Sequence, residues 1–146
     1  MAQANIETSR RLIEEAFSEG RLELLDEFCA DGFVSHDPLA GDQDVDAVKQ
    51  SITGYRDAFP DLTFTIEDIF DAGDKVVTRW TGVGTFENEF MGLAPTGEKG
   101  DPVHGMGIDR YDDDGKLAES WGQWDTLTLM RDLGAIPEGA SAVSQS

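Results

Sequence analysis

The spacing of apolar residues changes at Pro60, and this change limits the folds open to the chain more than any other feature. Before it, over residues 45–58, apolar side chains recur at spacings of three and four, which predicts an amphipathic helix that Asp42 or Asp44 can cap. After it, apolar and polar side chains alternate, as in a strand with one buried face. Helices thus come first along the chain and strands follow them.

The remaining segments fit the same order of elements. Two helices are expected over residues 4–19 and 21–29, and residues 33–38 are expected to be extended before a loop at 40–44. Strands are expected over 62–67 and 75–86, followed by a long loop, a hairpin over 104–125 and a short helix ending at Gly134. Helices that are segregated from an antiparallel sheet define the α+β class, here with three N-terminal helices packed on a strongly curved sheet. We expect one domain, residues 1–136, and a flexible tail, residues 137–146.

The charge of the chain excludes several kinds of partner. Thirty acidic residues against 11 basic ones give a formal net charge of −19, which argues against nucleic acid and against anionic membranes. We expect a cytoplasmic protein, because no apolar run is long enough to span a bilayer and no secretory signal is visible. So acidic a surface also suggests a protein that works in high salt, where screening removes self-repulsion.

The hairpin over residues 104–125 carries an unusual set of side chains. The pair Asp114-Gly115 predicts a two-residue turn between its strands. Because side chains alternate across a strand, one face of the second strand combines Glu119, Trp121, Gln123 and Asp125, and one face of the first combines His104, Met106, Ile108 and Arg110. We expect these two faces to lie on the same side of the sheet and to look into a space that the rest of the chain encloses.

Three more residues are candidates for binding a ligand. The long loop over 87–102 holds Phe90 and Met91, and an apolar loop of this length is often a lid. His36 precedes a loop, where it is either a hydrogen-bonded structural histidine or a polar group at the mouth of a pocket. No metal site is expected, because residues 110–121 lack the ligands of a calcium loop at their ends and two histidines are too few for zinc.

Several stretches of the sequence resemble one family. They are FPDLTFTIEDIFDAGDKVVTRWTGVGTF, F-x-G-x-x-P-T-G from Phe90 to Gly97, IDRYDDDGKLAESW, and D-x-L-x-L-x-x-x-L-G from Asp125 to Gly134. Together they resemble the SnoaL-like polyketide cyclases, or ester cyclases, of the NTF2-like and ketosteroid-isomerase-like fold, over about residues 5–134. The resemblance implies an NTF2-like cone and an intramolecular aldol closure that uses neither a metal nor an organic cofactor.

The resemblance also implies roles for particular residues. The acid/base aspartate of the family's last strand matches Asp125, and a histidine of the neighbouring strand is similar in placement to His104. Burial among Trp121, Met106 and Ile108 is expected to raise the pKa of Asp125 towards neutrality, although its position also suits a helix N-cap. His104 would donate a hydrogen bond to the developing oxyanion, while Gln123 and Trp121 would orient the substrate. Glu119 is expected to pair with Arg110 or Arg79.

The function expected from these features is cofactor-independent chemistry on a small hydrophobic carbonyl compound. A proton-shuttling isomerase of the ketosteroid-isomerase type is the alternative within the enzymes. A small-molecule binding module and a scaffold with a vestigial pocket are the alternatives outside them. A homodimer is expected, because Trp80, Trp124 and the alternate residues of the long strands suggest that a second copy covers the other face of the sheet.

Overall fold

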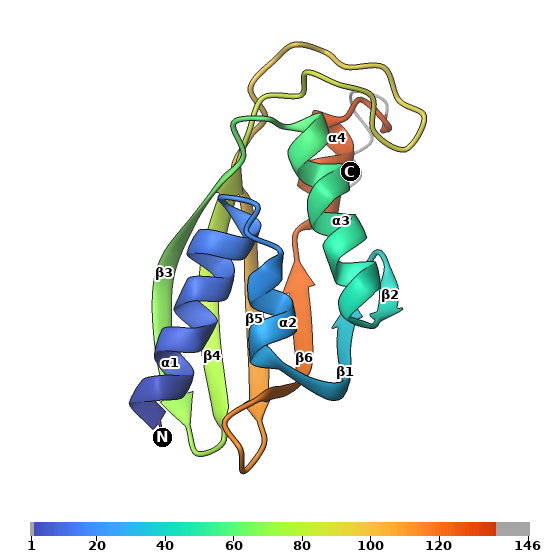
Figure 1. Ribbon diagram of the computed structural model, residues 1–146. Helices are drawn as coiled ribbons and strands as arrows, with labels where there is room; N and C mark the ends of the chain where they lie inside the picture. Colours follow the sequence, from blue (N-terminus) through green and yellow to red (C-terminus); the bar gives the residue numbers. More distant parts are fainter. Residues whose placement is uncertain (1, 137–146) are drawn as a thin grey trace.

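The computed structural model describes residues 2–136, and their fold is mixed α+β, as predicted (Figure 1). The first helix comprises α1, Ala2–Arg11, which continues into a π-helical segment, η1, Leu12–Phe17. Two more helices follow, α2, Glu23–Phe28, and α3, Val45–Ala58. A short fourth helix, α4, spans Thr126–Asp132. The described residues thus form four α-helices, the three predicted N-terminal ones and the predicted C-terminal one.

Six strands form one sheet in the order β2-β1-β6-β5-β4-β3. Their bounds are β1 Cys29–Asp37, β2 Gly41–Gln43, β3 Thr63–Ala72, β4 Lys75–Val83, β5 Val103–Tyr111 and β6 Leu117–Trp124. All neighbouring strands are antiparallel except β1 and β6, which run parallel. The prediction of a purely antiparallel sheet was therefore wrong at this pair, and the segment predicted as a loop at 40–44 contains β2.

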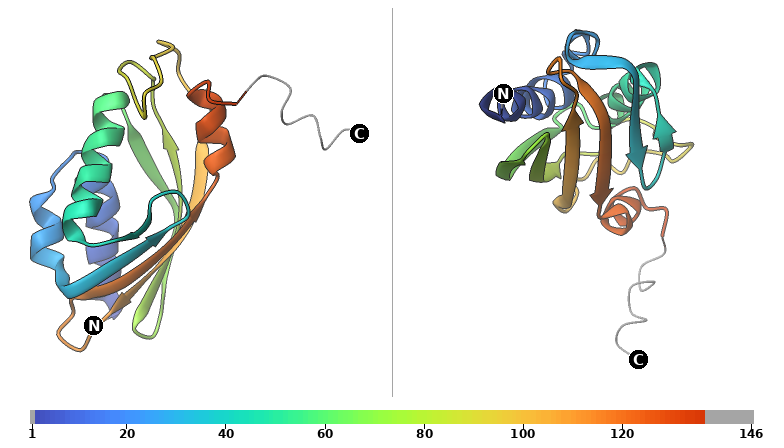
Figure 2. Two further views of the ribbon diagram at one scale, coloured as in Figure 1. Left: turned by 90° about the vertical axis from the view of Figure 1, so that its right-hand side faces the viewer. Right: turned by 90° about the horizontal axis from the view of Figure 1, so that it is seen from below.

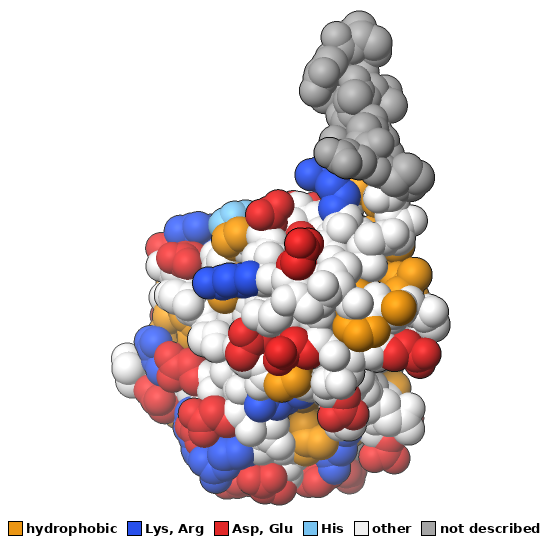
Figure 3. Space-filling view, turned by 90° about the horizontal axis from the view of Figure 1, so that it is seen from above, with side chains coloured by type: hydrophobic (Ala, Val, Ile, Leu, Met, Phe, Trp, Pro, Cys, Tyr) orange, Lys and Arg blue, Asp and Glu red, His pale blue; other side chains and the backbone are white. Residues whose placement is uncertain are grey.

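The sheet is strongly curved, and α1, α2 and α3 cover its concave face (Figure 2). The first helix and η1 lie over β3 and β4, and α3 lies near β1 and β2. The connection 84–102 and α4 lie together at one end of the molecule. Seen from that end, acidic side chains are spread among other residues and do not form one block (Figure 3).

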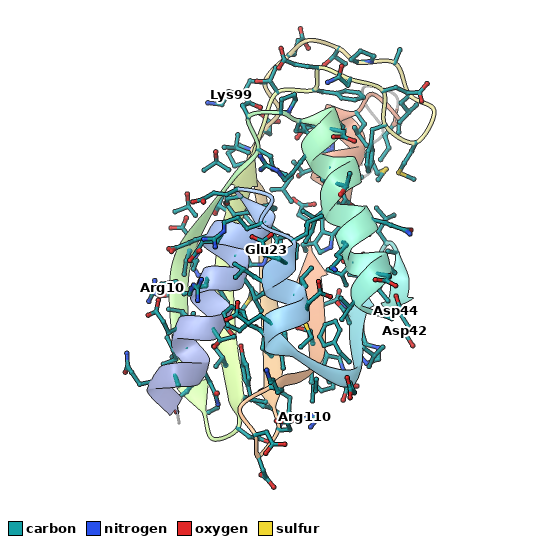
Figure 4. All side chains as sticks on the ribbon, viewed as in Figure 1. Arg10, Glu23, Asp42, Asp44, Lys99 and Arg110 are labelled. Carbon is teal, nitrogen blue, oxygen red and sulfur yellow. The ribbon has the colours of Figure 1, made fainter. Side chains whose placement is uncertain are left out.

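Helix α3 begins and ends where the sequence predicts. Asp44 is its N-cap, and the Asp44 side chain accepts a hydrogen bond from the backbone N–H of Ala47 at 2.8 Å (Figure 4). Val48 and Ile52 are buried towards the sheet, as the apolar spacing predicted. The last residue of the helix is Ala58, two residues before Pro60.

The β5–β6 turn differs from the predicted two-residue type. Only Gly115 of its two central residues has a positive φ, of 76°. The Asp112 carboxylate accepts hydrogen bonds from the backbone N–H groups of Asp114 and Lys116, each at 2.9 Å. The turn therefore spans residues 112–116, and the aspartate stabilises it by an Asx-type interaction.

Candidate functional site

The register of β5 and β6 decides which hairpin residues face the helices. Met106 pairs with Gln123, Ile108 with Trp121 and Arg110 with Glu119, so the two predicted faces do lie on one side of the sheet, as expected. That side is the outer one. The exposed fractions are 52% for Met106, 38% for Ile108 and 37% for Trp121. The prediction that this face is enclosed was wrong, because alternation separates two faces without telling which one the helices cover.

Asp125 acts as the N-cap of α4 in this structure. Its carboxylate accepts hydrogen bonds from the backbone N–H of Thr128 at 3.1 Å and from the Thr128 hydroxyl at 2.5 Å. These hydrogen bonds lower the pKa of Asp125 below its ordinary value, so the predicted upward shift was wrong. His104 is exposed on the outer face, where its Nδ1 lies 3.2 Å from the Thr81 hydroxyl.

His36 belongs to the outer face as well. Its Nδ1 lies 2.6 Å from the Asp42 carboxylate, and its Nε2 lies 2.7 Å from that of Glu119. The hydrogen bonds that the carboxylates of Glu119, which has the larger effect, and of Asp42 accept from the ring raise the pKa of His36. Its ring also stacks on Trp121 with the centroids 5.6 Å apart. Glu119 accepts a further hydrogen bond from Arg110 at 3.2 Å, which is the pairing predicted for it.

The remaining predicted binding residues do not meet at one place. Gln123 is exposed on the outer face. Phe90 packs on Tyr55 of α3 with the ring centroids 5.0 Å apart and belongs to the core beside α4. Met91 is 63% exposed in the connection 84–102. Neither residue lines the main cavity, and their contact with a ligand stays a prediction.

The main cavity lies between the concave face of the sheet and the helices. Its volume is about 250 Å³, and apolar side chains make up most of its wall. Residues from every helix line it, together with residues of five strands, among them His36, whose side chain also reaches the outer face. The aromatic residues in this wall are Phe17, Phe33, Tyr55, Phe59, Phe64, Trp80, Trp121 and Trp124. A cavity of this kind, largely apolar with a few polar groups, is the usual form of a small-molecule site.

The polar end of the cavity is built around the carboxyl group of Asp109. One carboxylate oxygen accepts a hydrogen bond from the Ser9 hydroxyl at 2.7 Å, and the other accepts one from the Ser120 hydroxyl. Asp109 retains some accessible surface, and because the residue lines the cavity, this surface faces it. Burial raises the pKa of Asp109, while the two serine hydroxyls oppose that shift.

Two more hydroxyl groups lie near this carboxyl. The Tyr111 hydroxyl lies 2.7 Å from the Ser9 hydroxyl. Because Ser9 has one proton to donate and Asp109 accepts it, Tyr111 must donate to Ser9 when Asp109 is ionised. Thr78, on the neighbouring strand, has a buried hydroxyl that finds no hydrogen-bond partner among the described residues.

The opposite end of the cavity holds polar groups with structural partners. The indole N–H of Trp124 donates to Asp37 at 2.9 Å. The backbone N–H of Asp101 donates to Asp132 at 3.1 Å, and burial raises the pKa of Asp132. Tyr55 lies on the same wall, and burial raises the pKa of its hydroxyl. Asp109 differs from these carboxyl groups because both of its side-chain partners are hydroxyls.

Within residues 2–136, no three histidine, cysteine, aspartate or glutamate side chains are grouped so that they could hold a metal ion. None of the helices described is long and apolar enough to cross a membrane. What the arrangement offers chemically is a carboxyl group, that of Asp109, that can take up or release a proton inside a largely apolar chamber.

The sequence did not predict a role for Asp109, although Asp109 lies in the hairpin over residues 104–125 whose other face was the predicted site. The signal that could have found it is the inner face of the same strands, which reads Gly105, Gly107 and Asp109 on β5 and Ser120 and Gly122 on β6. Small residues around one acid indicate space rather than a packed core. The outer face carries larger apolar and polar side chains, and for this reason the sequence predicted the binding site there.

The helices that cover a curved sheet, with a cavity between the two layers, define the NTF2-like class of proteins. The chain matches the SnoaL-like polyketide cyclase family over residues 7–133, and it belongs to that family. No protein of known, curated function matches it in sequence.

Solved structures show the same fold. IdmH from Streptomyces antibioticus, a candidate polyketide cyclase, is 32% identical, with a TM-score of 0.74 over 89% of this chain and 98% of its own. A candidate polyketide cyclase from Acidithiobacillus ferrooxidans is 28% identical, with a TM-score of 0.78 over 92% of this chain and 96% of its own. AclR from Streptomyces galilaeus, a candidate hydroxylase, is 24% identical, with a TM-score of 0.81 over 94% of this chain and 100% of its own. Its likeness shows the fold alone.

Proposed function

We propose that the protein is a cofactor-independent enzyme that performs acid/base chemistry on a hydrophobic carbonyl compound, of the kind that closes a ring in polyketide cyclases. Asp109 is the acid/base in this proposal. The observation that carries it is the placement of Asp109, a carboxyl group with a raised pKa at the polar end of an apolar cavity. Membership of the SnoaL-like polyketide cyclase family and the likeness to IdmH support the reaction class.

The chemistry can be written with one carboxyl group. The Asp109 carboxylate removes a proton from the carbon beside a carbonyl group, which leaves an enolate. The enolate carbon attacks a second carbonyl carbon of the same molecule and forms the new carbon–carbon bond. The resulting alkoxide takes the proton back from Asp109, so the carboxylate is regenerated and no net proton is exchanged.

The surroundings of Asp109 suit both halves of this cycle. A raised pKa makes the carboxylate a better base than an ordinary aspartate, because the pKa lies nearer to that of the carbon acid. The hydroxyls of Ser9 and Ser120 hold its two oxygens in place, so the group does not have to reorient. The aromatic wall at the other end of the cavity, which includes Trp80 and Trp124, offers contact area for the apolar part of the compound.

The proposed enolate step can be tested without knowledge of the natural substrate. Cyclic ketones such as 1-tetralone and 2-tetralone exchange the hydrogens beside the carbonyl group for deuterium in D₂O, and NMR follows the loss of the signal. We expect the protein to accelerate this exchange and Asp109→Asn to lose at least a hundredfold of the acceleration, in line with a general base.

The same experiment compares the two faces of the hairpin. Asp125→Asn and His104→Ala change the residues that the sequence put forward, and Asn can still cap α4. We expect both variants to exchange at nearly the rate of the unchanged protein. If Asp125→Asn and His104→Ala lose the exchange while Asp109→Asn keeps it, the reacting groups lie on the outer face and the proposal is refuted. A proton-shuttling isomerase shares the enolate step, and product analysis separates it from a cyclase.

A further inference from the structure

The inner face of the sheet is arranged in rows that run across three strands. The strand registers place Val76, Asp109 and Ser120 in one row. The next row is Thr78, Gly107 and Gly122, and the one after it is Trp80, Gly105 and Trp124. Successive rows are two residues apart along each strand, or about 7 Å. The middle row therefore lies between the acid and the two indole rings.

Glycines elsewhere on this inner face lie beneath aromatic rings. A Cβ atom added to Gly105 would lie 2.2 Å from the ring of Trp80, and one added to Gly82 would lie 2.8 Å from the ring of Phe64. In both cases a ring from the neighbouring strand lies over the glycine, where a side chain would otherwise stand. At each of these glycines, the ring therefore fills the space that a side chain on the glycine would otherwise occupy.

The two glycines of the middle row have no such ring. A Cβ added to Gly122 would meet nothing within 4 Å except the backbone oxygen of His36, at 4.0 Å. One added to Gly107 would meet only the backbone oxygen of Trp121, at 3.2 Å. Gly107 and Gly122 face each other across β5 and β6, and both line the cavity. They form a bare area of backbone beside Asp109.

A hydroxyl group without a partner lies at the end of the same row. Thr78 is 3% exposed and lines the cavity, and its hydroxyl has no hydrogen-bond partner among the described residues. A buried hydroxyl without a partner is unfavourable, so such groups are usually kept for a ligand or another specific use. Its place between β3 and the glycines lets it reach a polar atom of a molecule that lies on Gly107.

We propose that Thr78, Gly107 and Gly122 form the seat for a flat ring of the ligand. The ring lies on the two glycines as the rings of Phe64 and Trp80 lie on theirs, and an oxygen atom on it accepts a hydrogen bond from Thr78. This oxygen, a carbonyl or phenol group, then lies one row from Asp109. The inference rests on the proposed use of the cavity as a ligand site and adds the place and the residues that hold one ring of the ligand.

Fluorescence titration with 2-naphthol, which has two fused rings, and with phenol, which has one, tests the seat directly. Thr78→Val removes the hydroxyl and keeps the shape, and it should weaken 2-naphthol binding about tenfold, the effect of one hydrogen bond. Thr78→Ser should restore most of it. Gly122→Val fills the seat and should weaken 2-naphthol binding at least tenfold and phenol binding much less. Thr81→Val, on the outer side of the same strand, is the matched control and should bind as the unchanged protein does.

Equal affinity for 2-naphthol in the unchanged protein, Thr78→Val and Gly122→Val would overturn the seat, as would a failure of 2-naphthol to bind at all. The proposed chemistry is judged separately, by deuterium exchange in Asp109→Asn. Binding that depends on Thr78 and Gly122, without exchange that depends on Asp109, would support the seat and refute the acid/base role. Exchange that depends on Asp109, together with 2-naphthol binding that is unchanged in Thr78→Val and Gly122→Val, would support the acid/base role and refute the seat.

Discussion

Replacing Thr78 by valine should make the unliganded protein more stable. The Thr78 residue is 3% exposed, and its hydroxyl makes no hydrogen bond to any described residue. A buried polar group without a partner costs about 1–3 kcal/mol, and valine replaces the hydroxyl by a methyl group of similar size. Valine also suits a strand slightly better than threonine does. We therefore expect the free energy of unfolding to rise by about 1–2 kcal/mol.

The gain is large enough to measure in a thermal scan. For a chain of this size, 1 kcal/mol corresponds to about 2–4 °C in Tm, so Thr78→Val should melt about 3–6 °C higher. Urea unfolding of both proteins gives the free energy itself. Thr81→Val is the control, because the Thr81 hydroxyl lies 3.2 Å from His104 and its loss should be neutral or cost up to about 1 kcal/mol.

The comparison of the two variants can refute the reasoning. If Thr78→Val is no more stable than Thr81→Val, the Thr78 hydroxyl is satisfied in solution, and the case for a reserved hydrogen bond fails. Higher stability together with weaker ligand binding is the signature of a group kept for function. A purely structural threonine would not give both effects in one variant.

The α4 cap, the buried acid, the outer face of the sheet and the net charge can each be tested by one change. Asp125→Ala should lower the free energy of unfolding by about 1 kcal/mol through loss of the α4 cap, whereas Asp125→Asn should not, and urea unfolding measures both. Because burial raises the pKa of Asp109 above 3.8, the unfolded chain loses this proton first as the pH rises. The unchanged protein should therefore lose stability above pH 3.8 relative to Asp109→Asn, and parallel slopes of the two unfolding curves against pH would contradict this. The outer apolar group of Met106, Ile108 and Trp121 should be the contact of the predicted homodimer, so sedimentation should find a dimer that Trp121→Glu converts to a monomer. The net charge of −19 should make the unfolding midpoint rise from low to molar KCl, and equal midpoints would contradict a high-salt protein.

The α3 helix was predictable because its signals are local. The apolar spacing, the cap at Asp44 and the stop at Pro60 all lie within the segment, and each acts on its own backbone. The β3–β4 hairpin was predictable for the same reason, since its turn at residues 73–74 lies between two alternating stretches. Strand β2 was not predictable, because it has only three residues. The extended segment within β1 was predicted, but its parallel pairing was not, because the partner strand lies more than 80 residues away.

The candidate site shows why alternation alone could mislead. It placed Ile108 and Trp121 together correctly, since strand geometry requires it. It could not assign that face to the inside, because the true inner face, with Gly107, Asp109 and Gly122, lacks the large apolar side chains that usually mark burial. The strand residues that line a cavity can be small, and their face of the strand then lacks the bulky apolar pattern that predicts burial.

The hydrogen bond between Ser9 and Asp109 joins two residues that are 100 positions apart in the chain. Ser9 lies on α1 and Asp109 on β5, so the acid acquires its dry surroundings only when the first helix has docked on the finished sheet. During synthesis the helix emerges first, but the site cannot form until β5 and β6 have followed it. Any opening of α1 in the folded protein would let water reach the carboxyl group and return its pKa towards the ordinary value. The proposed acid/base function of Asp109 therefore requires that α1 stays docked on the sheet.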